Sequence, residues 1–332
     1  MKNTQVIQLM SIVRLSIFML GITMMSCNSK KEQQLPAIGK SVALFDYFSY
    51  KGNDDFYISN PLSGEDYFYN PILPGWYSDP SVCTNGEGDY FLVTSTFTYF
   101  PGVPIFHSKD LVNWKQIGHV LNRASQLVNM EGQKVSGGIF APAISYNPYN
   151  KTYYMVTTNV GAGNFFVKTQ DPFGEWSEPV MLPEVGGIDP SFFFDEDGKA
   201  YIVNNDEAPD NKPEYSGHRT IRIQEFDVKT DKTVGPRKIL VNKGAQPADK
   251  PIWIEGPHLY KINGKYFLMS AEGGTGNWHS EVIFRGDSPM GKFLPWKNNP
   301  ILTQRHLNSD RPNSVTCAGH ADLIQTKEGD WW

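Results

Sequence analysis

Cysteine is scarce in this chain, with three residues among 332. No two cysteines have the short spacing of zinc ligands and no His-Glu-x-x-His motif occurs, so nothing in the sequence resembles a zinc site. Cys83 and Cys317 could form a disulfide if the protein is exported, but we favour two buried free thiols. The sequence therefore predicts no metal-dependent chemistry and no required cofactor.

An excess of basic residues is also missing, because 30 Lys and Arg stand against 35 Asp and Glu, for a formal net charge of -5. Without a basic stripe to neutralise phosphates, nucleic acid is not an expected partner. No segment shows sustained helical periodicity. The bulk properties suit a neutral ligand such as a sugar but do not select one.

A long membrane-spanning run is absent, since the apolar stretch at residues 15–25 is too short for a comfortable span. It ends at Met24-Met25-Ser26-Cys27, which resembles the lipobox of bacterial lipoproteins. In such proteins the cysteine is acylated and becomes the new N-terminus. We therefore expect a lipoprotein signal peptide at residues 1–27, with Cys27 as the lipid anchor, rather than a plain secretory signal.

This signal would place the protein in the bacterial cell envelope, attached to a membrane through its lipid. Whether it faces the periplasm or the cell surface stays open. The polar residues that follow read as a tether and N-terminal extension at 28–66. The remaining residues, 67–332, form the predicted globular domain.

Aromatic residues, by contrast, are abundant at 13%, and 30 glycines and 23 prolines accompany them, as in a protein of many short strands and turns. One short phrase recurs five times, and each copy leads through a turn into an aromatic strand. In three copies the phrase carries an acidic residue. The five copies are Ser78-Asp79-Pro80-Ser81-Val82, Phe140-Ala141-Pro142-Ala143-Ile144, Ile188-Asp189-Pro190-Ser191-Phe192, Ile254-Glu255-Gly256-Pro257-His258-Leu259 and Gly319-His320-Ala321-Asp322-Leu323.

Further strand-like segments follow most of these openers, which gives about four antiparallel strands per copy. This pattern is typical of β-propeller blades, and a β-sandwich would not repeat the opener. We predict an all-β, five-bladed β-propeller. Its innermost strands would bring Asp79, Ala141, Asp189, Glu255 and His320 around one axis.

The fifth copy stops at Trp332, where its second strand should continue. We therefore expect the fifth blade to be incomplete and the sequence to be C-terminally truncated. An open propeller leaves an unpaired edge, which favours aggregation. The chain as written is predicted to fold poorly.

The openers and the segments around them resemble glycoside hydrolase family 43. The likeness runs from about residue 70 to residue 332 and rests on motifs in a fixed order. These motifs lie at residues 70–81, which include Trp76-Tyr77-Ser78-Asp79-Pro80, and at 97–105, 107–114, 188–191, 255–260, 271–275 and 319–323. The resemblance implies a five-bladed propeller and an inverting glycosidase that acts on xylosides and arabinofuranosides.

Carried over by motif, the resemblance makes Asp79 the general base and Glu255 the general acid, with Asp189 tuning the acid and orienting the substrate. Inversion needs one carboxylate to activate water and a protonated partner to donate to the leaving oxygen. A neighbouring negative charge would help to keep Glu255 protonated. Each residue alone has an ordinary structural explanation, since Asp-Pro often opens turns.

Aromatic residues are expected to line the sugar pocket, and the candidates are Phe97, Tyr99, Phe100 and Trp278, although each could belong to the core. His320 aligns with the acids and is predicted to lie beneath the substrate. In some family members the matching histidine helps to hold a calcium ion through waters, but we favour a buried, hydrogen-bonded histidine.

The function that the sequence predicts is an exo-acting glycosidase that releases terminal L-arabinofuranosyl or D-xylosyl units from plant hemicellulose oligosaccharides, with a leaning to arabinofuranosides. One alternative is a non-catalytic, envelope-tethered propeller that only binds sugar. Another is a retaining fructan hydrolase of a related family, but the Arg-Asp-Pro motif that it would require is absent.

Overall fold

The computed structural model describes residues 55–64 and 66–332. The chain divides into two compact units, Met1–Pro61 and Leu62–Trp332. The described part of the first unit holds one short helix, α2 (Asp55–Ser59). Cys27, the predicted signal peptide at 1–27 and most of the predicted tether lie outside the described residues. No helix in the described part of the chain is long and apolar enough to cross a membrane.

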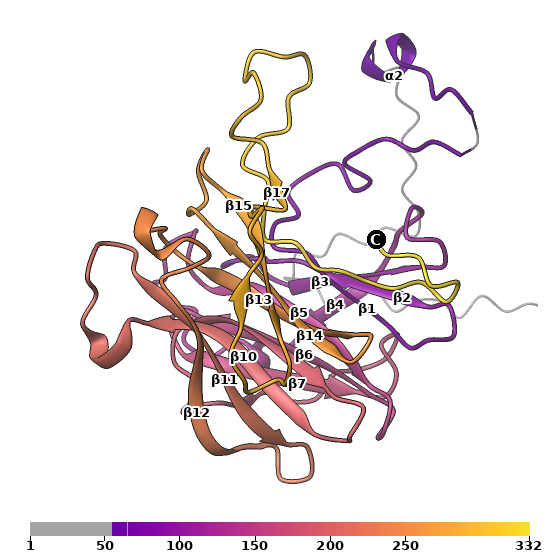
Figure 1. Cartoon of the computed structure of the whole chain (residues 1–332). Helices are drawn as coiled ribbons and strands as arrows, with labels where there is room; N and C mark the ends of the chain where they lie inside the picture. Colours follow the sequence, from indigo (N-terminus) through magenta and orange to yellow (C-terminus); the bar gives the residue numbers. More distant parts are fainter. Residues whose placement is uncertain (1–54, 65) are drawn as a thin grey trace, which may run out of the picture. The chain divides into compact units, whose positions relative to one another are not determined.

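The second unit is built from antiparallel β-strands (Figure 1). The strands of the first two sheets are β1 (Ser81–Thr84), β2 (Tyr90–Val93), β3 (Gly102–Ser108), β4 (Lys115–Leu121), β5 (Ile139–Asn147), β6 (Thr152–Asn159), β7 (Gly163–Thr169) and β8 (Val180–Met181). The strands of the next two sheets are β9 (Ile188–Phe194), β10 (Ala200–Glu207), β11 (Arg219–Asp227), β12 (Lys232–Asn242), β13 (Glu255–Ile262), β14 (Lys265–Glu272), β15 (Ser280–Gly286), β16 (Leu294–Pro295) and β17 (Leu302–Thr303). Three short 3-10 helices lie in the connections: η1 (Ala124–Gln126), η2 (Pro209–Asn211) and η3 (Pro247–Asp249).

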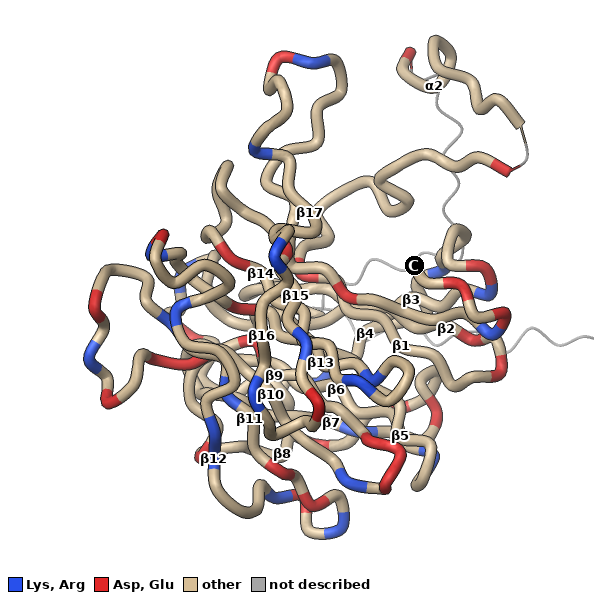
Figure 2. The backbone as a smooth tube through the Cα atoms, viewed as in Figure 1, with Lys and Arg blue, Asp and Glu red and all other residues tan. Residues whose placement is uncertain are grey.

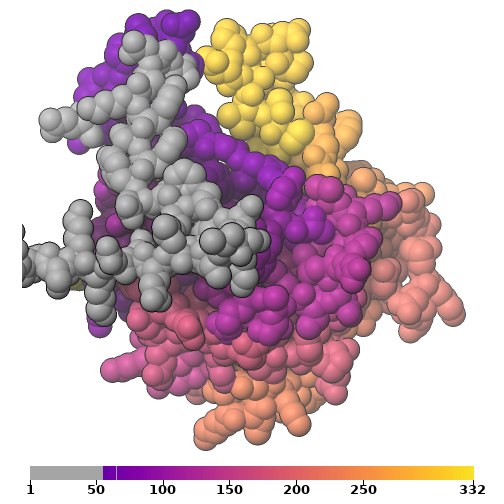
Figure 3. Space-filling model, turned by 180° about the vertical axis from the view of Figure 1, so that it is seen from behind, coloured from indigo at the N-terminus to yellow at the C-terminus, as the bar shows by residue number. Residues whose placement is uncertain are grey.

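Each sheet runs in chain order from an inner to an outer strand: β1 to β4, β5 to β8, β9 to β12 and β13 to β16, with β17 also paired to β15. The inner strands β1, β5, β9 and β13 lie next to one another in that order. The space-filling view shows segments of successive sheets side by side in chain order (Figure 3). This arrangement confirms an all-β propeller.

The hairpins form where the turn chemistry predicts them. Asn263 and Gly264 join β13 to β14 with φ angles of 51° and 71°, the left-handed conformation that a tight hairpin needs at both positions.

Lys and Arg are interspersed with Asp and Glu along the described part of the chain, which shows no stripe of a single charge sign (Figure 2). The hydrophobic core lies between the sheets.

Three apolar clusters fill the three interfaces between consecutive sheets. The first joins side chains such as Phe91 and Phe165, the second Tyr154 and Phe192, and the third Ile221 and Leu268. Burial of these faces holds the sheets together without the directional hydrogen bonds that pair strands within one sheet.

The predicted number of blades is wrong for the described chain, which has four sheets rather than five. The fifth copy does not make a sheet. Residues 319–323 run without ladder pairing between β1 and β13, and beyond them Ile324 and Trp332 exchange two backbone hydrogen bonds of 3.0 and 2.9 Å. Only a short hairpin, with an isolated bridge between Gln325 and Trp331, occupies the fifth position.

Cys83 and Cys317 are free thiols, as favoured from the sequence, but the predicted burial is confirmed only for Cys83. Cys83 is buried in β1 and Cys317 is partly exposed. Burial raises the pKa of the Cys83 thiol well above its usual value, so this cysteine is an inert part of the core.

Candidate active site

The five openers share a backbone conformation that non-glycine residues rarely adopt. Asp79, Ala141, Asp189 and His320 have φ angles of 53°, 36°, 54° and 55°. Gly256 has the same conformation, with φ of 55°. Backbone strain of this kind persists where the surroundings impose it, and it often marks a functional site.

This geometry corrects the predicted register in the fourth copy. The residue that joins the ring is Gly256, which precedes Pro257 as Asp79 precedes Pro80, and not Glu255. A Cβ added at Gly256 would lie 2.6 Å from the His320 ring, so glycine leaves the space that this imidazole occupies. Glu255 stands one residue before the ring position, at the start of β13.

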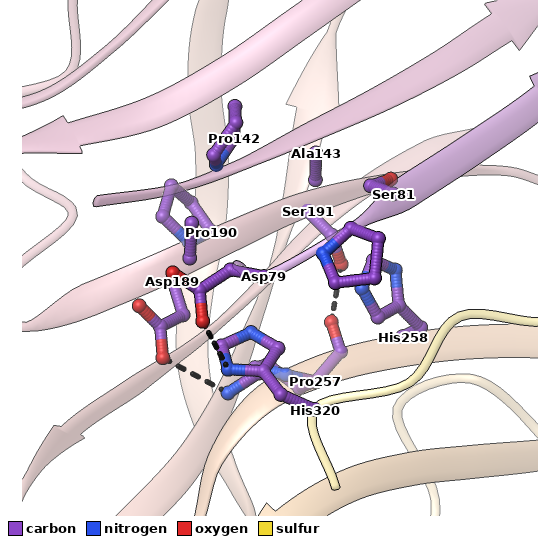
Figure 4. Close-up of a pocket in the computed structure, with 13 residues that line it drawn as sticks. Asp79, Ser81, Pro142, Ala143, Asp189, Pro190, Ser191, Pro257, His258 and His320 are labelled. Carbon is purple, nitrogen blue, oxygen red and sulfur yellow. Dashed lines mark hydrogen bonds and ion pairs between the residues drawn. The ribbon is translucent and has the colours of Figure 1, made fainter. Parts of the chain in front are cut away.

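The ring encloses a small cavity whose lining includes Asp79, Ala141, Asp189, Gly256 and His320 (Figure 4). Its volume of about 10 Å³ is close to the roughly 10–15 Å³ that one water needs. A sugar cannot enter such a space. The cavity is therefore too small to bind a sugar by itself, although two of the three acids, Asp79 and Asp189, line it.

Asp79 has the most accessible carboxylate of the three acids, with 25% of its side chain exposed. Its Oδ2 accepts a 2.6 Å hydrogen bond from the Ser95 hydroxyl, which itself accepts one of 2.7 Å from the backbone N–H of Ala141. Its Oδ1 lies 3.4 Å from Nδ1 of His320. Asp79 is thus held in a fixed orientation while it remains open to water.

Asp189 is almost fully buried, at 5% exposure. Its Oδ2 accepts a 3.0 Å hydrogen bond from the backbone N–H of Gly256, and its own N–H donates to the Thr158 hydroxyl at 3.1 Å. Burial, together with the negative charge of Asp79, raises the pKa of Asp189 to about 6, against the opposing effects of His320 and the Gly256 N–H. Asp189 is therefore mostly ionised at neutral pH.

Glu255 is buried to a similar degree, at 8% exposure. Burial raises its pKa to about 8, and the negative charges of Asp189 and Asp79 add to this effect. Both effects favour the protonated form of Glu255 over its carboxylate. The structure thus brings together one accessible carboxyl group, just before β1, and two buried ones, at the starts of β9 and β13.

Sequence reasoning missed Arg219, at the start of β11. Its positive charge lowers the pKa values of Asp189 and Glu255 and so limits how far their burial raises them. Its guanidinium lies 4.2 Å from the centre of the Trp253 ring and pairs with Glu207. Nothing in the local sequence indicates this role, because Arg219 reaches the acids only through the packing of separate strands.

Two of the predicted substrate-binding aromatics gather around Trp76, which was not among the candidates. Phe97 stacks on Trp76 with ring centres 5.2 Å apart, and Tyr99 meets the same ring edge-on at 5.3 Å. Phe140 packs edge-on against Phe97 at 5.5 Å. Phe100, the residue after Tyr99, is exposed to solvent. Trp76 comes just before the first opener and Phe140 begins the second, so the cluster lies at the first two openers.

Trp278 lies elsewhere. It is 69% exposed and lines a separate groove of about 420 Å³ with Ile252 and Glu272, where Arg305 approaches its ring at 5.7 Å. His320 lines the ring cavity, as the opener pattern predicts. Within residues 55–64 and 66–332, no group of three or more His, Cys, Asp or Glu side chains is arranged to hold a metal ion.

Comparisons with known proteins identify relatives of this chain. The family model described as "Glycosyl hydrolases family 43" matches residues 68–332. A protein named "Xylosidase/arabinosidase" from Butyrivibrio fibrisolvens is 47% identical over 266 residues, which are 79% of this chain and 49% of the relative. A "Non-reducing end alpha-L-arabinofuranosidase" from Bacteroides ovatus is 41% identical, over 83% of this chain and 49% of the relative.

Among solved structures, a GH43_12 protein retrieved from a capybara gut metagenome is similar with a TM-score of 0.77 and 55% identity, over 82% of this chain and 50% of that one. The chain thus spans about half the length of the relatives that it matches. The match nevertheless covers every opener and all four sheets. On this evidence the chain belongs to glycosyl hydrolase family 43.

Proposed function

We propose that the protein is an exo-acting, inverting glycosidase that releases terminal L-arabinofuranosyl or D-xylosyl units from hemicellulose oligosaccharides of plants. The observation that carries this proposal is the division of labour among three carboxylates at one end of the ring. Burial and neighbouring carboxylates raise the pKa of Glu255 and so favour its protonated form, Asp79 is open to water, and Asp189 contributes to the raised pKa of Glu255 through its charge.

These roles give a balanced reaction. Asp79 takes a proton from a water as the water oxygen bonds to the anomeric carbon, and the glycosidic bond breaks on the opposite face of the sugar. Glu255 gives its proton to the departing oxygen. Exchange with solvent then returns the proton from Asp79 and reprotonates Glu255. Inversion follows because water attacks directly and no covalent sugar intermediate forms.

Several features support a sugar as substrate. The cluster of Trp76, Phe97 and Tyr99 offers flat apolar faces, which pack well against the C–H faces of a sugar ring. The names of the relatives include both xylosidase and arabinosidase. We propose that both sugars are accepted, because the same three acids can serve either ring. Within this dual activity we propose a preference for arabinofuranosides.

Two finer aspects belong to the same proposal. We infer that Cys27 carries a lipid that attaches the protein to the bacterial envelope, as the preceding lipobox-like residues suggest. We also infer that the complete propeller has five blades. A groove of about 770 Å³ on the fourth sheet, lined by Phe267, Ile283 and Trp296, offers an apolar face of the kind that the other sheets bury against a neighbour.

The proposal is tested by incubating the protein with nitrophenyl arabinofuranoside, nitrophenyl xyloside and arabinose-substituted xylo-oligosaccharides. Proton NMR of the first-formed sugar should show the inverted anomer, and Asp79→Asn should abolish its release. A retained anomer would remove Asp79 from the role of base. Tight sugar binding without any release would favour the non-catalytic binding propeller instead.

A further inference from the structure

The fifth opener is held in place without belonging to a sheet. Residues 319–323 make no strand ladder, yet they are mostly shielded from solvent between β1 and β13. A backbone in this situation must find its hydrogen bonds elsewhere, because unpaired buried polar groups are costly. The partners are found on two buried carboxylates, Asp322 within the segment and Glu281 on β15.

Asp322 joins the first sheet to the fourth. Its Oδ2 accepts hydrogen bonds from the Ser81 hydroxyl at 2.8 Å and the Val82 N–H at 2.9 Å, both on β1. Its Oδ1 accepts a bond from the Tyr260 hydroxyl on β13 at 2.6 Å and one from the N–H of Leu323 at 2.9 Å. Each oxygen of one carboxylate is therefore committed to a different sheet.

This carboxylate is held by hydrogen bonds rather than by a full positive charge. Its side chain is only 7% exposed. Among the residues that the structure describes, the nearest basic group is His258, whose Nδ1 lies 3.6 Å from Oδ1, and burial lowers the pKa of His258. A buried carboxylate without a cation needs all of its donors, so the loss of one bond leaves polar groups unsatisfied on both sheets.

The same segment sets the position of His320. The N–H of Ala321, between His320 and Asp322, donates to Oε2 of the fully buried Glu281 at 2.9 Å. The ring of His320, the residue before Ala321, lies over Gly256, and its Nδ1 is 3.4 Å from Oδ1 of Asp79. Figure 4 shows His320 beside Asp79, with a dashed line between them. Because His320 lies only two residues before Asp322, a displacement of Asp322 would also displace the imidazole of His320.

We propose that Asp322 is a positioning residue that ties the first sheet to the fourth across the fifth position of the ring, and thereby fixes His320 against Asp79. The catalytic consequence rests on the proposed function, because it concerns the orientation of the proposed base. The structural consequence does not, and it can be measured in a protein of any activity.

The first test is Asp322→Asn, with Asp330→Asn as the control, since Asp330 is exposed in the short hairpin that follows the segment. We expect NMR signals of the His320 ring, assigned with a His320→Gln variant, to shift in Asp322→Asn and to stay in place in the control. Unchanged His320 signals in Asp322→Asn would overturn the proposal. This readout does not depend on turnover, so its failure differs from a failure of the glycosidase assignment.

The second test is a double-mutant cycle with Ser81→Ala and Tyr260→Phe. The described contacts link these two hydroxyls through Asp322, so their effects on the unfolding transition should be non-additive, and the coupling should vanish in an Asp322→Asn background. Strict additivity in the native background would overturn the bridge.

In the glycosidase assay, Asp322→Asn should lower kcat by about 10- to 100-fold with KM changed less than about threefold, because a displacement near 1 Å can cost this much in rate. Asp330→Asn should leave both constants unchanged. A kcat equal to that of the parent protein, in a variant whose His320 signals had moved, would overturn the catalytic part of the proposal.

Discussion

At the scale of single residues, the surroundings of a carboxyl group, and above all its burial, determine its pKa more than whether the residue is Asp or Glu. Glu255 and Asp189 are both buried carboxyls, yet they hold their protons to different pH values. The pKa of Asp189 rises to about 6 and that of Glu255 to about 8, in each case with burial as the main cause. The hydrogen bond from the Gly256 N–H favours the ionised form of Asp189.

The first prediction concerns Glu255 as the acid. Glu255→Gln keeps the shape but removes the proton that the leaving oxygen needs, so kcat on an unactivated oligosaccharide should fall about 10²- to 10⁴-fold. The loss should be smaller on a nitrophenyl glycoside, whose leaving group departs without protonation. Steady-state kinetics on both substrates measure the difference, and Glu87→Gln, in the exposed turn after β1, serves as control. Equal losses on the two substrates would contradict the role.

The second prediction concerns the pH profile. Glu255 must be protonated to act, so kcat/KM falls as pH rises through its pKa, which the charge of Asp189 helps to raise. Asp189→Asn removes that charge, Glu255 ionises earlier, and the alkaline limb should move about one unit to lower pH. A profile of kcat/KM against pH measures the shift.

Asp197→Asn, in the exposed turn between β9 and β10, is the control and should leave the limb in place. A limb that stays in place or moves to higher pH in Asp189→Asn would show that Asp189 does not act on the acid through its charge.

At the scale of elements, the recurring openers predicted most of the inner strands, because each combines a turn with an apolar strand. The register of the fourth copy was missed for a definite reason. The carboxylates were aligned with one another, whereas the structure aligns the residues that precede proline, and this places Gly256 on the ring. Trp76 and Arg219 were not predicted, since their partners are distant in the sequence.

The third prediction tests that register. Gly256→Ala should lower the free energy of unfolding for two reasons: the backbone at this position is left-handed, and the added Cβ would lie 2.6 Å from the His320 ring. Gly264→Ala is a matched control, with φ of 71° but nothing within 4 Å of the added Cβ. The control should lose about 1 kcal/mol of unfolding free energy, and Gly256→Ala should lose more. Denaturant titration of both variants measures the two costs, and similar losses would contradict the steric account.

At the scale of the whole molecule, the four sheets bury three interfaces, and the fourth sheet keeps one apolar face uncovered. That face is the groove lined by Phe267, Ile283, Leu294, Trp296 and Ile301. The ring is joined across its fifth position by the hydrogen bonds of Asp322 instead of by a packed sheet. The sequence indicated the fifth opener, but it could not show that the carboxylate of Asp322 joins the first and fourth sheets there.

The last prediction follows from the uncovered groove. Large exposed apolar patches favour association, so the 332-residue chain should self-associate at micromolar concentration, with Leu294 and Trp296 in the contact. Leu294→Lys combined with Trp296→Lys should shift the population toward monomer in sedimentation velocity, because lysine adds charge to the patch without entering the core. Tyr149→Lys, at an equally exposed aromatic outside the groove, should leave association unchanged. If the control variant becomes monomeric to the same extent, general surface charge and not this groove governs association.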